Sequence, residues 1–142
     1  MRTFALRDGD LSLSSGTYEE VTGSTKLYQD LSYAMREPLG CDRFHLGWGS
    51  TLPRFIGGVS NPSTVVLVQN EARRIVRNYA AIQQERIRED ANARRPSRFG
   101  TGEVIKDIRS IQARVGYDVL DVRCAVSTLS AAEVVLVTSV RA

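Results

Sequence analysis

Hydrophobic and polar positions alternate near the start of the chain. Between residues 10 and 22, Leu11 and Leu13 are separated by polar residues, and a similar alternation resumes after Gly16. A period of two is typical of a β-strand with one buried face, and an intervening glycine is typical of a turn. The pattern therefore predicts a small hairpin, and Asp8-Gly9 is a candidate for an earlier tight turn.

The period changes to that of a helix in two later segments. Residues 24–36 carry apolar side chains at helical spacing, and Ser24 is a candidate N-cap. A longer helical pattern begins at Asn61-Pro62, an N-cap followed by a proline at the first helical position, and extends to about Arg88. Residues 89–98, EDANARRPSR, are strongly polar and are predicted to be exposed.

The end of the chain is predicted to form strands. Residues 101–107 favour a short helix capped by Thr101, and strands are expected over 108–115, 117–128 and 133–140. The last strand, EVVLVTSV, is apolar on both faces, whereas a sheet with one solvated face is polar at every second position. Either this strand is central and covered by both helices, or it pairs with a strand of another chain.

Residues 37–60 predict a long ordered loop between the two helices. Glycine and proline are too frequent there for a regular element, and the aromatic and aliphatic residues argue against disorder. We expect Trp48 and Phe55 to anchor this loop to the body. The glycines would let the loop pass closely over the body.

These elements predict an α+β fold, with a small mixed or antiparallel sheet packed with two main helices, in a single domain over residues 1–142. The chain is 42% hydrophobic and 25% charged, which is ordinary for a globular protein. It shows neither an apolar run long enough to cross a bilayer nor a signal peptide. We expect Cys41 and Cys124 to be reduced thiols in a cytoplasm-assembled protein.

The net charge of +3 is concentrated in one part of the chain. Residues 71–98 hold eight arginines and four acidic residues, a net of +4, so the remainder carries −1. Such a cluster fits a nucleic-acid footprint, a merely solvated face, or a surface that pairs with carboxylates of a protein partner. We favour the protein partner, because arginine is enriched at protein interfaces.

Catalytic and metal-binding signals are weak. His45 is the only histidine, so a metal site would need Cys41 and Asp42 beside it, and a structural histidine is the simpler interpretation. Glu37 and Asp42 are a candidate glycosidase pair, although any chain with 16 acidic residues offers such a pair by chance. Spacings typical of serine hydrolases, zinc proteases and phosphate-binding loops do not occur. We therefore predict no catalytic residues, no metal and no cofactor.

The order of several short motifs resembles a known family. KLYQDL is followed by EPLG, then by GWGS, and then by IG, within residues 26–57. In this order and spacing the chain resembles the gene-25-like baseplate wedge family of contractile phage tails, whose members are also called sheath initiators. The similarity extends from about residue 10 to residue 140.

The resemblance implies structural work rather than catalysis. It implies a fold like that of a contractile-sheath subunit domain, assembly in the host cytoplasm, and a final place in the baseplate of the virion tail. The implied partners are the sheath protein and the baseplate wedge proteins, with tail tube or hub proteins as further candidates. Six copies per baseplate are implied, and neither nucleic acid nor membrane is expected as a partner.

The resemblance also implies two binding sites. Family members often carry a Glu-Pro-Arg motif after the long helix, which grips the helical bundle of the wedge; here the proline is missing, and Glu85, Arg86 and Arg88 are the candidates. Exchange of terminal strands in related assemblies implies sheath binding by the last strand, at Val134, Val135, Leu136, Val137 and Thr138. An older family label mentions lysozyme, which no carboxylate arrangement here supports. A tail-associated cell-wall hydrolase and a nucleic-acid-binding regulator are the alternatives.

Overall fold

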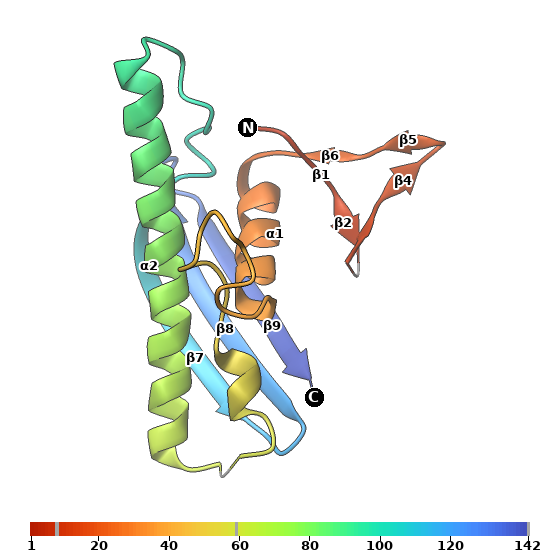
Figure 1. Cartoon of the computed structure of the whole chain (residues 1–142), viewed down its shortest axis with the longest axis vertical. Helices are drawn as coiled ribbons and strands as arrows, with labels where there is room; N and C mark the ends of the chain where they lie inside the picture. Colours follow the sequence, from red (N-terminus) through yellow and green to blue (C-terminus); the bar gives the residue numbers. More distant parts are fainter. Residues whose placement is uncertain (8, 59, 142) are drawn as a thin grey trace.

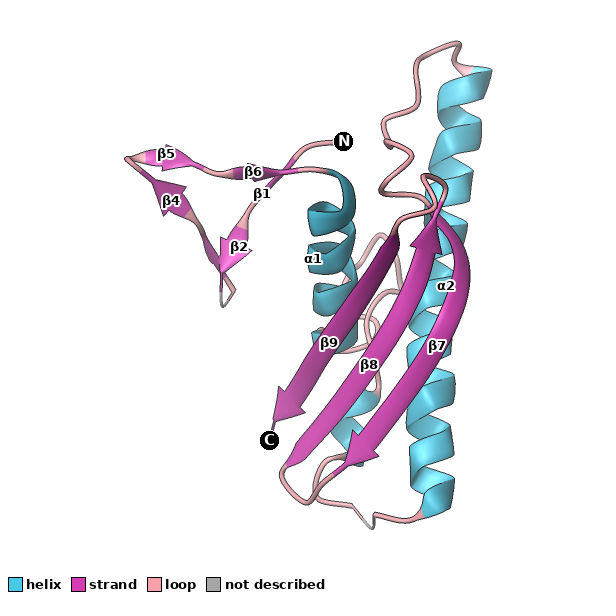
Figure 2. Ribbon diagram, turned by 180° about the vertical axis from the view of Figure 1, so that it is seen from behind, coloured by secondary structure: helices cyan, strands magenta, loops and turns pink. Residues whose placement is uncertain are grey.

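A three-stranded antiparallel sheet with two helices on one of its faces forms the body of the protein (Figures 1 and 2). The structure is a computed structural model that describes residues 1–7, 9–58 and 60–141. The predicted α+β fold is confirmed. The elements of the body are α1 (Gly23–Arg36), the short 3₁₀ helix η1 (Leu52–Phe55), α2 (Pro62–Asn92), β7 (Ile105–Val115), β8 (Val119–Thr128) and β9 (Glu133–Arg141).

The strand order is β7-β8-β9, so β8 is central and β9 lies at an edge. One of the two interpretations of the last strand, a central strand covered on both faces, is therefore wrong. Residues of β9 alternate strictly between buried and exposed, because successive side chains of a strand point to opposite faces. The buried side chains of the strands meet those of α1 and α2 in one core, which includes Leu27, Leu31, Val76, Leu120, Val122, Val126 and Leu136.

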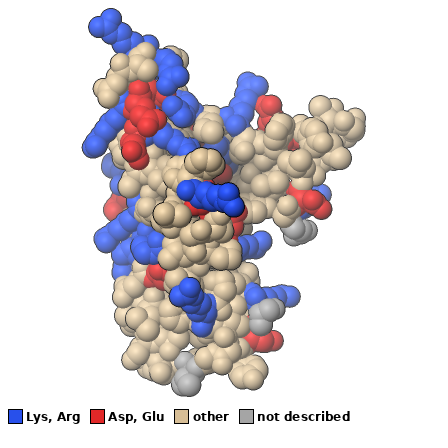
Figure 3. Space-filling model, in the orientation of Figure 1, with Lys and Arg blue, Asp and Glu red and all other residues tan. Residues whose placement is uncertain are grey.

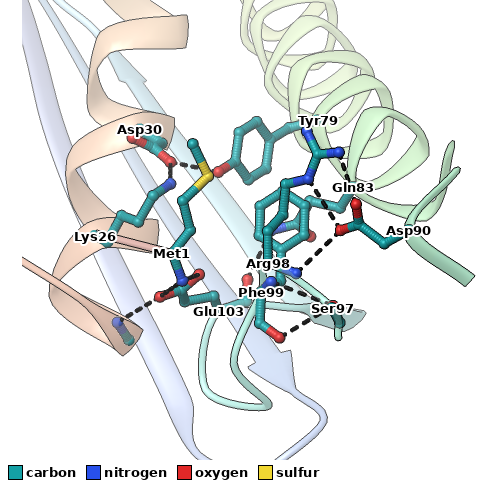
Figure 4. Close-up of polar contacts among 11 residues, drawn as sticks. Met1, Lys26, Asp30, Tyr79, Gln83, Asp90, Ser97, Arg98, Phe99 and Glu103 are labelled. Atoms are coloured by element: carbon teal, nitrogen blue, oxygen red, sulfur yellow. Dashed lines mark hydrogen bonds and ion pairs between the residues drawn. The ribbon is translucent and has the colours of Figure 1, made fainter. Parts of the chain in front are cut away.

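The start of α2 agrees with the prediction, and its end does not. The Asn61 side chain accepts a hydrogen bond from the main-chain N–H of Thr64 at 2.7 Å, as an N-cap should. The helix continues to Asn92 rather than ending near Arg88. Asp90, which is only 3% exposed, accepts hydrogen bonds from the Arg98 guanidinium at 2.8 and 2.9 Å (Figure 4). The predicted exposure of residues 89–98 is thus wrong for Asp90, because this ion pair folds the segment back onto the helix.

The turn before β7 replaces the short helix that was predicted over residues 101–107. The side-chain amide of Gln83 donates to the carbonyl of Glu103 at 2.8 Å and accepts from the N–H of Ile105 at 3.1 Å. A helix over these residues would use the same main-chain groups internally. The long-range contacts with α2 therefore override the local preference, and β7 begins at Ile105.

The N-terminus of α1 is also held by this turn. The helix begins at Gly23, and the predicted capping by Ser24 is wrong. Instead the Glu103 carboxylate accepts from the N–H of Gly23 at 2.9 Å and lies 3.3 Å from the main-chain nitrogen of Met1 (Figure 4). A carboxylate at this position satisfies a free N–H group of the first turn and complements the helix dipole.

Residues 1–7 and 9–21 form an arm that projects from the body (Figure 1). Three short antiparallel pairs make up the arm: β1 (Thr3–Phe4) with β6 (Glu20–Val21), β2 (Leu6–Arg7) with β3 (Asp10–Leu11), and β4 (Leu13–Ser14) with β5 (Thr17–Tyr18). The predicted hairpin is present, but its buried face is not, because Leu11 and Leu13 are 47% and 61% exposed. Asp8, part of the predicted tight turn, lies outside the described residues.

A closed ring of main-chain hydrogen bonds joins the three pairs of the arm. The N–H of Ala5 donates to the carbonyl of Glu19 at 2.7 Å, Glu19 donates to Ser12 at 3.1 Å, and Ser12 donates back to Ala5 at 2.9 Å. The Ser12 hydroxyl also donates to the Glu19 carboxylate at 2.6 Å. The centre of the arm is thus built from satisfied polar groups rather than from a hydrophobic core.

Candidate functional site

The loop over residues 37–60 is held against α2 by polar side chains of that helix. The Arg74 guanidinium donates to the carbonyl of Gly49 at 2.8 Å, and the Asn78 side chain donates to the carbonyl of Gly47 at 2.9 Å. The Glu71 carboxylate accepts from the N–H of Thr51 at 2.8 Å and also pairs with Arg74. These contacts hold residues 47–51 of the loop in a fixed position against α2.

Trp48 lies at the centre of this loop. Its ring stands 5.9 Å from the ring of Tyr79, and its indole N–H donates to the Glu37 carboxylate. Gly49, the next residue, has a φ of +95°, and a Cβ atom there would lie 2.4 Å from the carbonyl oxygen of Pro38. The glycine that follows Trp48 therefore allows the main chain at Gly49 to pass in close contact with the main chain at Pro38.

Phe55 contacts the body at the other end of the loop. It belongs to η1, is half-buried and packs against the core, as Trp48 does. Leu52 in the same short helix is fully buried. The two expected anchors thus lie at separate points of the loop and both touch the core.

The two carboxylates considered for glycoside hydrolysis serve to shape the loop. Glu37 accepts from Trp48, and Asp42 accepts from the N–H of Phe44 at 2.8 Å and lies 3.0 Å from His45 Nδ1. The pKa of Asp42 is lowered, first by the Phe44 hydrogen bond and then by His45. A general acid needs the opposite, a pKa raised toward neutrality, so Asp42 does not suit that task.

His45 and the cysteines do not converge on a metal site. Over residues 1–7, 9–58 and 60–141, no group of three or more His, Cys, Asp or Glu side chains is arranged to hold a metal ion. Cys41 is exposed, whereas Cys124 is buried, and burial raises the pKa of the Cys124 thiol to about 11. Within the part of the chain that the structure describes, no helix is long and apolar enough to span a membrane.

A cavity of about 260 Å³ lies beside His45 and Trp48 and also reaches Asp30 and Arg86. Asp30 accepts from the Tyr79 hydroxyl at 2.5 Å and pairs with the buried Lys26 (Figure 4). Burial and the neighbouring Asp30 carboxylate raise the pKa of Tyr79 well above its ordinary value. The polar groups at the floor of this cavity are already bonded to one another, so they form a structural network.

The predicted wedge-binding residues lie on the C-terminal half of α2. Glu85 and Arg88 are exposed, and their spacing puts them on the same side of the helix. Arg86 is half-buried and lines the cavity beside His45, so it lies apart from the other two. Among the described residues none of the three forms an ion pair.

The predicted sheath-binding residues of β9 divide between its two faces. Val134, Leu136 and Thr138 are buried against the helices, whereas Val135 and Val137 are 37% and 53% exposed. The outer edge of β9 pairs with no other strand of the described chain. This edge therefore offers main-chain groups and two valine side chains to a partner.

The two edges of the sheet differ in how they would receive another strand. Along β7 the register shifts twice, between Ile105 and Asp107 and between Ile108 and Ser110, whereas β9 pairs with β8 without a shift. Bulges and charged side chains discourage the addition of a strand, and β7 also carries exposed Lys106 and Arg109. Of the two edges, β9 is the one suited to pairing.

Tyr28 is a residue at this edge that the sequence analysis did not single out. It lies on α1, is 41% exposed, and its hydroxyl donates to the carbonyl of Val137 at 3.4 Å. Together with Thr25 and Val135 it lines a cavity of about 310 Å³ between α1 and β9. Its place in the helical apolar pattern indicated a core residue, and only the packing of α1 beside β9 shows its polar contact.

Comparison with known proteins gives one similar structure. No protein-family model matches the chain, and no curated protein matches its sequence. A solved structure from Geobacter sulfurreducens, described as a "putative tail lysozyme", matches with a TM-score of 0.56 at 14% sequence identity. The match covers 93% of this chain and 96% of that one. At this identity the likeness shows a shared fold over nearly the whole length of both chains.

Proposed function

We propose that this protein is a structural component of a contractile tail, in which it joins the baseplate wedge to the first ring of the sheath. The observation that carries the proposal is the open edge of β9, with Val135 and Val137 exposed beside it. The order of motifs within residues 26–57 supports the same interpretation. So does the fold that this chain shares with the structure described as a tail lysozyme.

Binding at β9 would occur by addition of a strand. A strand from a sheath subunit would hydrogen-bond to main-chain groups at the outer edge of β9, replacing the Tyr28 hydroxyl at the carbonyl of Val137. These bonds are directional, so they would fix the register of the first sheath subunit. Val135 and Val137 would be covered by alternate side chains of the added strand. Covering two half-exposed valines contributes about 1–2 kcal/mol, so main-chain pairing and further contacts would have to supply the rest.

The experiment substitutes exposed residues at the edge of β9 and leaves the core residues of that strand unchanged. Deleting β9 is unsuitable, because Val134, Leu136 and Val140 belong to the core. Val135→Lys with Val137→Lys instead places two charges on the exposed positions, which discourages pairing at an edge. The matched control is Gln112→Lys on β7 with Tyr117→Lys in the turn that follows it, where both positions are also exposed.

Each variant would be co-expressed with the sheath and wedge proteins of the same tail, and the captured proteins would be identified. We expect the β9 variant to lose the sheath protein and keep the wedge proteins, and the β7 control to keep both. Capture of the sheath protein by the β9 variant at the level of the unaltered protein would reject strand addition at β9.

The alternative, a cell-wall hydrolase, is favoured by the name of the similar structure. Against it stand the hydrogen bonds that occupy Glu37 and Asp42, and the lowered pKa of Asp42. We propose that the protein acts by binding and not by catalysis. Clearing of a peptidoglycan suspension by the purified protein, with loss of clearing in Asp42→Asn, would establish the hydrolase instead.

A further inference from the structure

We propose that a groove between α2 and β7 binds an acidic segment of a partner protein. The groove has a volume of about 340 Å³ and lies at the edge of the sheet opposite to β9. Lys and Arg side chains gather along the α2 side of the molecule (Figure 3). We call this site the basic groove and define it by four cationic side chains, Arg73 and Arg77 from α2 and Lys106 and Arg109 from β7.

The four cations of the basic groove lack acidic partners, unlike other arginines near them in sequence. Arg74 pairs with Glu71, and Arg95 and Arg98 pair with Asp90. Within the described residues none of the four groove cations forms an ion pair, and Arg73 bonds only to the Asn70 side chain, at 3.1 Å. The local excess of positive charge is therefore left for a ligand.

One acidic side chain, Asp107, also lines the basic groove, so four cations and one anion leave a net charge of +3. The Asp107 carboxylate accepts from the N–H of Ile108 at 2.8 Å, a local contact within β7. Among the described residues it forms no ion pair with any of the four groove cations. A ligand with several carboxylates complements this charge, since guanidinium groups bind carboxylates in a bidentate manner.

The apolar part of the basic groove favours a peptide over a nucleic acid. Ala80, Ile108 and Ile111, which are half-buried, line it together with the cations. Apolar side chains of a peptide fit such a surface. Single-stranded nucleic acid would instead need aromatic side chains for base stacking, and the groove has none among its described lining residues. The favoured ligand is therefore a segment that combines Asp or Glu with apolar residues.

The basic groove is independent of the proposed site at β9, because the two lie at opposite edges of one sheet. Arg73 and Arg77 are also separate from Glu85, Arg86 and Arg88, which lie nearer the C-terminal end of α2. The basic groove is thus a third surface, besides the edge of β9 and the predicted wedge-binding residues of α2. Its proposed ligand follows from the charge and shape of the groove, not from strand pairing.

The test measures fluorescence anisotropy of a labelled nonapeptide made of three Glu-Glu-Leu repeats, with the full-length protein. We expect binding that weakens about tenfold in Arg77→Glu with Arg109→Glu, since both substitutions reverse a charge in the basic groove. Arg77→Lys with Arg109→Lys keeps the charge and loses the bidentate geometry, so an intermediate loss of about threefold is expected.

The matched control is Arg43→Glu with Arg54→Glu, which changes the net charge equally at two exposed positions outside the basic groove. We expect this control to bind the peptide within about twofold of the unaltered protein. Circular dichroism verifies that every variant is folded, and capture of the sheath protein, which should be unchanged, separates this proposal from the one at β9.

Three results would overturn the proposal. The first is the absence of peptide binding by the unaltered protein. The second is an equal loss in the groove variant and the control, which would indicate unspecific attraction. The third is tighter binding of a short DNA probe than of the peptide, lost only in the groove variant, which would identify a nucleic-acid site.

Discussion

The carboxylate of Glu103 accepts a hydrogen bond from the main-chain N–H of Gly23 at 2.9 Å, although 80 residues separate the two. The first turn of α1 is thereby tied to the turn that precedes β7. Gln83 of α2 holds the same turn by two further hydrogen bonds. A single turn therefore links α1, α2 and the sheet by hydrogen bonds, in addition to the core that they share.

Replacement of Glu103 by alanine should destabilise the protein. Glu103 is 2% exposed, and removal of its carboxylate leaves the N–H of Gly23 without its acceptor. We expect a loss of about 1–3 kcal/mol in the free energy of unfolding, measured by urea denaturation. Glu20→Ala removes an exposed carboxylate that pairs with Arg2 at 3.4 Å and should cost less than about 0.5 kcal/mol. Equal losses in the two variants would contradict the capping role of Glu103.

Gly49→Ala should also destabilise the fold, by more than about 1 kcal/mol. The residue has a φ of +95°, and the new Cβ atom would lie 2.4 Å from a carbonyl oxygen that cannot move freely. Gly47→Ala is the control from the same motif, because its nearest neighbours are 3.7 Å away on a side chain. Thermal unfolding of both variants checks the prediction, which fails if Gly49→Ala melts at or above the temperature of Gly47→Ala.

The Asp90–Arg98 pair should make stability depend on pH in the acid range. Hydrogen bonds from the Arg98 side chain and main chain lower the pKa of Asp90 from its ordinary 3.8 to about 2. Because the folded pKa is the lower one, the stabilisation is complete above the ordinary value and is lost as the pH falls through the folded value.

The difference between the unaltered protein and Asp90→Asn isolates this effect. We expect the urea midpoint of the unaltered protein to exceed that of Asp90→Asn at pH 5, and the gap to narrow as the pH approaches about 2. Other carboxyl groups titrate in both proteins and cancel in the difference. A gap that stays constant across this range would show that Asp90 ionisation does not contribute.

Glu85→Ala with Arg86→Ala should weaken capture of the wedge proteins, because the resemblance to the sheath initiators implies that these residues grip the wedge. Co-purification from cells that express the wedge proteins provides the measurement. Arg7→Ala with Asp10→Ala removes one positive and one negative charge, both exposed, from the arm and should leave capture unchanged. Full capture by the α2 variant would place the wedge contact elsewhere.

The parts of the fold with local signals were predictable from the sequence. Asn61 and Pro62 mark the start of α2, and the apolar run over residues 133–140 marks β9 within one residue of its true end. The short helix over 101–107 was wrong, since the side chain of Gln83, about 20 residues earlier in α2, takes up its main-chain groups. Local propensity contains no information about such contacts.

The candidate sites were predictable to a smaller extent. The sequence identified β9 as unusual, but only packing shows that Val135 and Val137 are the accessible members of the set. The local excess of arginine was visible along residues 71–98. Its convergence with Lys106 and Arg109 depends on α2 lying beside β7, which is a property of the tertiary structure.

Main-chain hydrogen bonds among Ala5, Ser12 and Glu19 form a ring at the centre of the arm. The shape of the arm therefore depends little on which side chains point outward from it. Main-chain groups close the ring, so Leu13, which is 61% exposed, can be exchanged for another residue while the ring persists. The main-chain ring of the arm therefore does not depend on which exposed side chains the arm presents. Substitutions confined to exposed residues of the arm can therefore change which partner protein the arm contacts. They leave the core shared by α1, α2 and the sheet unchanged.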